Sequence, residues 1–91
     1  MQFMIVAYDG QDEGALNRRL AVRDSHIAGA IALKNAGNLI AGGAILDEAG
    51  RMIGSTTYVE FESRADLDNW LQQEPYVTVD VWHDITITLV R

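Results

Sequence analysis

The sequence predicts one α+β domain whose elements follow one another as strand, helix, strand, strand, helix, strand. Ninety-one residues, 1–91, make a single small domain. The first and last predicted strands are rich in apolar and β-branched residues, which favour extended structure. Between them, two segments carry apolar residues at helical spacing, and a polar turn joins the two middle strands.

The first strand is predicted over residues 3–8. Apolar or aromatic side chains fall on both parities of this segment, which is typical of a strand covered on both faces. Asp9 and Gly10 end it. Residues 11–14 are polar and predict a loop, and residues 15–20 predict a short helical turn.

The first full helix is predicted to begin at a cap formed by Asp24 or Ser25 and to end at Ala36. Gly37 follows as its left-handed terminator. This helix is nearly apolar all round, so we expect it to be mostly buried. His26 then lies in its first turn, where the helix dipole favours the neutral, proton-accepting imidazole.

The two middle strands are predicted to form a hairpin. Residues 39–46 make its first strand, in which Gly42-Gly43 indicates a bulge or a close backbone approach. Asp47-Glu48-Ala49-Gly50 makes the turn. The second strand of the hairpin, with alternating side chains, extends to about Glu62.

The second helix begins at a capping box, because Ser63 is followed three residues later by Asp66. It extends to about Gln73, and Glu74-Pro75 ends it, since proline disfavours a helical conformation at the residue before it. A last strand is predicted over residues 82–90.

This order predicts the ferredoxin-like, or split βαβ, arrangement, a four-stranded antiparallel sheet with two helices on one face. The outer strands carry apolar residues on both parities, so the uncovered sheet face should also be buried. Small domains without cysteine gain burial by oligomerisation. We therefore expect a homodimer that forms through the sheet.

Composition excludes several partners. The net charge of −6 disfavours nucleic acid and anionic membranes, since both attract basic surfaces. Residues 1–4 lack the features of a signal peptide, and no apolar run approaches the length of a membrane span. The sequence predicts a cytoplasmic protein.

His26 is the leading candidate for chemistry, because histidine gives or takes a proton near neutral pH. It acts either as a general acid or base, or as a structural residue that caps the helix or bonds a backbone carbonyl. Arg18, Arg19 and Arg23 precede it; they either attract an anionic substrate, with Arg23 the best placed, or pair with nearby carboxylates such as Asp9 and Asp12.

Glu74 has two interpretations. It either orients His26 as a second acid, or it is a solvated residue at a helix end. Tyr8 and Ser55 are further candidate pocket-lining donors.

Other site types have little support. The sequence does not support a metal site, because it has only two histidines, no cysteine and no His-x-x-x-His spacing. His83 is expected to be a partly buried strand residue whose hydrogen bonds are made within the protein. Gly54-Ser55 does not complete a serine-hydrolase elbow, and Gly42-Gly43 does not continue into a phosphate-binding loop. No cofactor is expected.

The chain resembles the YciI family over residues 3–87. The resemblance rests on short motifs in a fixed order: Arg18 and Arg23 before His26, Ala36-Gly37, Gly42, Gly50, Gly54-Ser55 and Glu74-Pro75-Tyr76-Val77. It implies a small ferredoxin-like protein of the dimeric α/β-barrel group, which dimerises through the sheets. This agrees with the architecture predicted from the strand pattern.

The resemblance also implies an active site. Family members are proposed to pair a histidine at the first helix with an aspartate in an Asp-Pro-Phe/Tyr-Val segment, which correspond here to His26 and Glu74. This chain has Asp24 where the family usually has proline, Gly42-Gly43 where it usually has Gly-Pro, and Glu74 where it has aspartate.

Relatives in the wider group include isomerases, dehalogenating enzymes and monooxygenases that act on small compounds without a cofactor. The leading expectation is therefore a cofactor-independent enzyme in which His26 moves a proton, Glu74 holds it, and Arg23 places a small anionic or aromatic ligand. The alternative is a non-catalytic ligand-binding or accessory module on the same dimeric fold.

Overall fold

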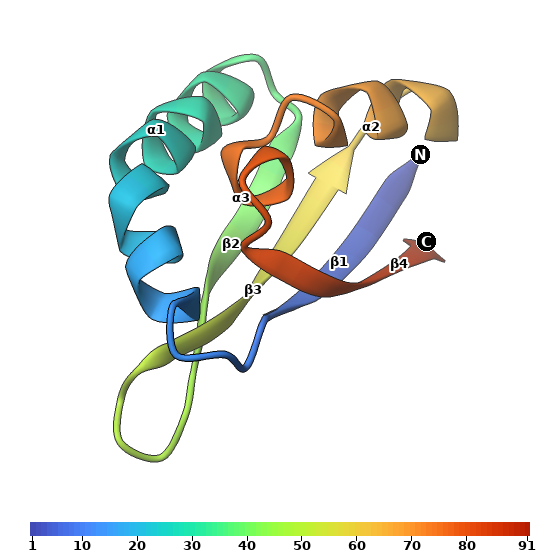
Figure 1. The fold of residues 1–91 in the computed structure, drawn as a ribbon. Coiled ribbons are helices and arrows are strands. Elements are labelled where there is room, and N and C mark those ends of the chain that lie inside the picture. Colours follow the sequence, from blue (N-terminus) through green and yellow to red (C-terminus); the bar gives the residue numbers. More distant parts are fainter.

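In the computed structural model, which describes residues 1–91, helices cover one face of a four-stranded antiparallel sheet (Figure 1). The strands lie in the order β2-β3-β1-β4, which confirms the predicted ferredoxin-like arrangement. No helix is both long and apolar enough to span a membrane. In chain order the elements are β1 (Gln2–Asp9), α1 (Ala15–Asn35), β2 (Leu39–Leu46), β3 (Met52–Glu60), α2 (Arg64–Leu71), α3 (Pro75–Thr78) and β4 (Trp82–Val90).

The core lies between the sheet and the helices. Strand β1 is central, and its odd-numbered residues face the helices while its even-numbered residues face away. One buried cluster forms around Phe3 and Ile5, and a second around Tyr76 and Trp82. Within one chain β1 is thus covered on one face only, and Tyr8 on the other face is 45% exposed.

Helix α1 differs from the prediction at its start. It is continuous from Ala15 to Asn35, whereas a turn over 15–20 and a separate helix capped at residues 24–25 were predicted. No glycine or proline interrupts residues 15–28, and Asp24 and Ser25 face solvent on the outer side of the helix. His26 therefore lies near the middle of α1, so the predicted effect of the helix dipole on it is wrong.

The expected burial of α1 is also wrong. Only Ala15 and Arg19 are buried, and Ile31 is 56% exposed. The helix has small apolar side chains on all sides, but the single chain offers packing partners to one side only. Its predicted end is confirmed, because Gly37 directly follows the cap with a φ of 85°.

The hairpin between β2 and β3 is confirmed. Across the turn, the backbone N–H of Asp47 donates a hydrogen bond to the backbone carbonyl of Arg51 at 2.9 Å. Gly50 has a φ of 82°, in the left-handed region. The pairing of β2 with β3 shifts register between Leu39 and Ala41 and again between Ile45 and Leu46. Neither shift lies at Gly42, where an added Cβ would be 3.2 Å from a backbone oxygen of β3. Strand β3 ends at Glu60, two residues before the predicted end.

The segment after α2 contains a helix that the sequence interpretation missed. Ser63 caps α2 as predicted, accepting a hydrogen bond from the Asp66 N–H at 3.1 Å. Helix α2 ends at Leu71, two residues before the predicted end, and Pro75 begins the short helix α3, with Glu74 as its N-cap. Proline suits the first position of a helix because the N–H that it lacks has no helical partner there.

Candidate functional site

His26 and Glu74, 48 residues apart in sequence, meet between α1 and the start of α3, with their side chains in direct contact. Glu74 Oε1 contacts His26 Nδ1, and the same oxygen accepts the Tyr76 N–H at 3.3 Å. The Glu74 side chain is only 3% exposed and the His26 side chain 18%. Glu74 is therefore a buried carboxylate rather than a solvated helix end, because the α3 cap turns it inward.

The contact with Glu74 selects one form of the imidazole. A carboxylate oxygen can only accept a hydrogen bond here, so it favours the tautomer with the proton on Nδ1, and in that neutral ring Nε2 carries the lone pair. His26 Nε2 makes no hydrogen bond within the protein, and the residue lines a cavity. The imidazole is thus held from the Nδ1 side, and its residue borders the cavity.

Aromatic rings hold the imidazole plane. The Tyr76 ring stacks on His26 with centroids 3.9 Å apart and planes at 12°, and Trp82 meets His26 by its edge at 6.1 Å. Burial raises the pKa of the Tyr76 phenol, although the positive charges of Arg19 and Arg23 act in the opposite direction. Tyr76 thus faces His26 as a neutral ring.

Arg19 is a buried residue whose importance the sequence interpretation did not separate from its neighbours. Its guanidinium bonds both Asp9 oxygens at 2.9 and 3.0 Å and donates to Ser55 Oγ at 2.9 Å. It also lies 4.7 Å from the centre of the Tyr76 ring. Asp9 shares the parity of the buried residues of β1, and this signal could have identified the pair.

Ser55 lies within this network. Its hydroxyl oxygen accepts hydrogen bonds from Arg19 and from Trp82 Nε1, the latter at 3.1 Å, and the residue lines the cavity beside His26. Ser55 is on β3 opposite Ala7, on the helix-covered face. Ser55 and His26 thus border the same cavity.

The other two arginines differ from Arg19. Arg18 pairs with Asp12 at the surface at 2.7 Å, and this guanidinium lowers the pKa of the Asp12 carboxyl. Arg23 lines the cavity and forms no ion pair. Of the three, Arg23 is the cation available to a ligand.

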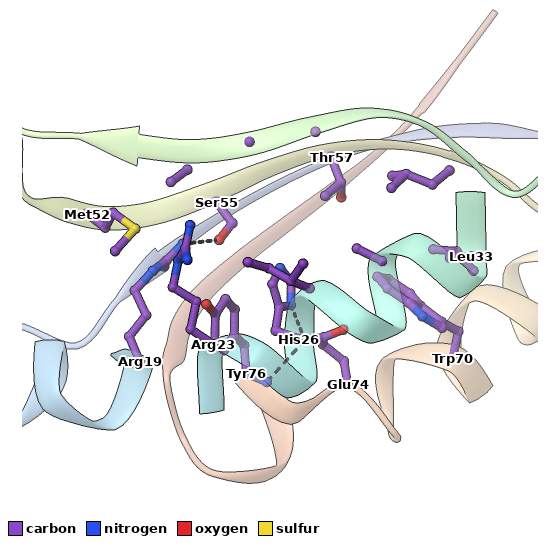
Figure 2. A pocket seen from close by; sticks show the side chains of 16 residues that line it. Arg19, Arg23, His26, Leu33, Met52, Ser55, Thr57, Trp70, Glu74 and Tyr76 are labelled. Carbon is purple, nitrogen blue, oxygen red and sulfur yellow. Dashed lines mark hydrogen bonds and ion pairs between the residues drawn. The ribbon is translucent and has the colours of Figure 1, made fainter. Parts of the chain in front are cut away.

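The cavity has a volume of about 210 Å³ and lies between α1 and strands β2 and β3 (Figure 2). Its polar wall includes Arg23, His26 and Glu74, and half of its 16 lining residues are hydrophobic. Apolar walls with a few convergent polar groups are typical of small-molecule sites.

Tyr8 and His83 lie apart from this cavity. Both border a second, more acidic hollow near the β1–α1 loop. The structure thus brings together His26, Glu74, Arg23 and Ser55 but leaves Tyr8 elsewhere. His83 is 42% exposed beside Asp80, not partly buried as expected, because the register of β4 shifts at this point.

Comparison with known proteins gives consistent matches along the chain. A model of the YCII-related domain matches residues 1–91. The chain is 32% identical over 93 aligned positions to the protein YciI of Escherichia coli, with 96% of this chain and 93% of that protein covered. It is 35% identical over 94 positions to a protein of Haemophilus influenzae, with the same two coverages of 96% and 93%.

Solved structures share the fold. 5-Chloro-2-hydroxyhydroquinone dehydrochlorinase of Burkholderia phenoliruptrix, solved in complex with 2,5-dihydroxybenzoquinone, matches with a TM-score of 0.86 at 22% identity, covering 100% of this chain and 94% of that one. An antibiotic biosynthesis monooxygenase matches with a TM-score of 0.56 at 16% identity, covering 100% and 97%. At these identities the likeness shows a common fold.

Proposed function

This chain belongs to the YCII-related domain family, and we propose that it is a cofactor-independent enzyme that moves a proton on a small molecule. His26 is the general base or acid, Glu74 holds and polarises it, and Arg23 places an anionic or aromatic substrate. The observation that carries the proposal is the buried His26–Glu74 pair at the wall of a cavity, with Nε2 free.

The chemistry follows from the pair. Nε2 takes a proton from a carbon or hydroxyl of the substrate, and the resulting imidazolium is stabilised by the Glu74 carboxylate at Nδ1. The electron pair left on the substrate has two outcomes. Return of the proton to another atom gives an isomerisation, and expulsion of a leaving group gives an elimination, as in a dehalogenation.

The structural likeness to a dehydrochlorinase that holds 2,5-dihydroxybenzoquinone supports a substrate with one oxygen-bearing ring. The size of the cavity also supports this. An apolar cavity of about 150 Å³ accepts benzene, so about 210 Å³ accommodates a ring with substituents.

The proposed enzyme is a homodimer that forms through the sheet face opposite the helices. Met4, Val6 and Tyr58 lie on that face, where the single chain offers them no covering layer. Burial of such a face against a second copy adds to the small core of one chain.

Proton transfer is tested without knowledge of the full reaction. Ring acids, phenols and quinols are incubated in D₂O, and deuterium incorporation or elimination is followed by NMR. We expect turnover by the wild type and a loss of at least about a hundredfold in His26→Ala and Glu74→Gln, since base catalysis contributes about 10²–10⁴-fold.

The matched control is His83→Ala, because His83 lies outside the cavity. It should exchange at the wild-type rate. Ligands that bind the wild type without any exchange would instead support the non-catalytic binding module, and exchange that survives His26→Ala would exclude His26 as the base.

A further inference from the structure

The cavity between α1 and the sheet changes in character along its length. Arg23 and Ser55 lie at one end, and Leu33 and Trp70 lie at the other (Figure 2). Because an α-helix rises 1.5 Å per residue, Arg23 and Leu33 are separated by about 15 Å along α1. A ligand in the cavity therefore lies between a charged end and an apolar end.

Charge determines which way an anionic ligand is oriented. The positive charge of Arg19 is already matched by Asp9, whereas Arg23 faces the cavity without a carboxylate partner. Glu74, in the middle of the cavity, repels an anion placed beside it. The negative group of a ligand is thus most stable at Arg23, away from Glu74.

The size of the cavity suits a single ring. A volume of about 210 Å³ exceeds by less than half the volume of about 150 Å³ that holds benzene. The difference leaves room for one short substituent in addition to the ring.

We infer that the cavity binds a one-ring acid or phenolate with a short apolar substituent opposite its charge. The charged group contacts Arg23, the ring lies beside His26, and the substituent extends toward Leu33 and Trp70. This inference takes the cavity as the substrate site and in that respect rests on the proposed function, but it does not require proton transfer.

Three probes test it: benzoate, 4-ethylbenzoate and the neutral 4-ethylbenzyl alcohol. Kd is measured by NMR titration of the indole N–H signals, since Trp70 lines the cavity. We expect 4-ethylbenzoate to bind about tenfold more tightly than benzoate, because two carbons leave water. It should also bind about tenfold more tightly than the alcohol, because a charge-assisted bond to Arg23 is lost.

Two variants assign the preferences to the two ends. Arg23→Gln should remove the preference for the acid over the alcohol and retain that for the ethyl group. Ala30→Leu, which fills the cavity near its apolar end, should remove the preference for the ethyl group and retain that for the acid over the alcohol. Lys34→Gln and Ala28→Leu are matched controls, since both residues are exposed on α1 outside the cavity, and both preferences should persist in them.

Equal affinities for the three probes, or no binding at millimolar concentration, would overturn the inference. It would also be overturned if Arg23→Gln removed the preference for the ethyl group and Ala30→Leu removed the preference for the acid. His26→Ala should keep both preferences. Preferences that persist while no proton exchange occurs would refute the proposed reaction alone, and exchange without the preferences would refute this inference alone.

Discussion

Three arginines near the start of α1 have three different electrostatic environments. Arg18 pairs with Asp12 at the surface, Arg19 pairs with Asp9 in the interior, and Arg23 remains unpaired beside the cavity. Removal of one partner from a buried pair leaves an uncompensated charge in the interior, whereas surface charges are largely solvated.

Arg19→Met should therefore lower the free energy of unfolding by about 3–5 kcal/mol, because Asp9 stays buried without its cation. Arg18→Met is the matched control and should change stability little. Urea unfolding followed by circular dichroism measures both. Similar losses in the two variants would show that the Arg19–Asp9 pair is not desolvated as described.

Tyr76 gives a prediction at alkaline pH. Burial raises the pKa of its phenol above the ordinary value of 10.0, so the folded state holds this proton more strongly than the unfolded chain. The associated stability is complete below the unfolded pKa and is lost as pH rises through the folded pKa.

Tyr76→Phe should consequently lose less stability than the wild type between about pH 9 and about pH 11. Urea midpoints at the two pH values provide the measurement. A wild-type decline in Tyr76→Phe would contradict the prediction.

At the level of elements, one of two glycines in the α1 region can accept a side chain and the other cannot. Gly29 lies within the helix, and a Cβ there meets no atom within 4 Å. Gly37 follows the helix with a φ of 85°, a conformation that disfavours any side chain.

The same substitution should thus act in opposite directions. Gly29→Ala is expected to raise the free energy of unfolding by about 0.5–1 kcal/mol, and Gly37→Ala to lower it by about 1 kcal/mol. Thermal and urea unfolding of both variants provide the check. A stability loss in Gly29→Ala would mean that this position is more crowded than the structure shows.

The sequence predicts most elements because their signals are local. All four strands, the hairpin and the Ser63 cap follow from short apolar or alternating segments bounded by turn and capping residues. The start of α1 is harder to predict, since Asp24 and Ser25 resemble a cap but face solvent within a continuous helix. Helix α3 is a single turn and leaves no periodicity to detect.

The site is predictable to a smaller extent. His26 and Glu74 are identifiable through the family resemblance, but their contact depends on the packing of α3 against α1. The roles of Arg19 and Ser55 depend on three elements meeting, and no local pattern encodes such a meeting. Strand parity alone places Asp9 with the core.

For the whole molecule, the uncovered sheet face predicts self-association. Thr56 is exposed on that face opposite Val6, so a charge there leaves the single chain unaffected but opposes a second sheet. Thr56→Glu should elute with the mass of one chain in size-exclusion chromatography with light scattering, and the wild type with twice that mass.

Ile31→Glu is the matched control, because Ile31 is also exposed but lies on α1, away from the sheet. It should retain the mass of the wild type. A wild-type protein with the mass of one chain, or an equal effect of the two substitutions, would exclude dimerisation through this face.

One oxygen of Glu74 both caps α3 and contacts His26, and this double use has an evolutionary consequence. The cap alone is served as well by serine, threonine or asparagine. A descendant that exchanged Glu74 for one of these residues would keep the turn and lose the carboxylate beside His26. A related chain with the same fold would then differ at this one residue in whether its histidine has a buried acidic neighbour.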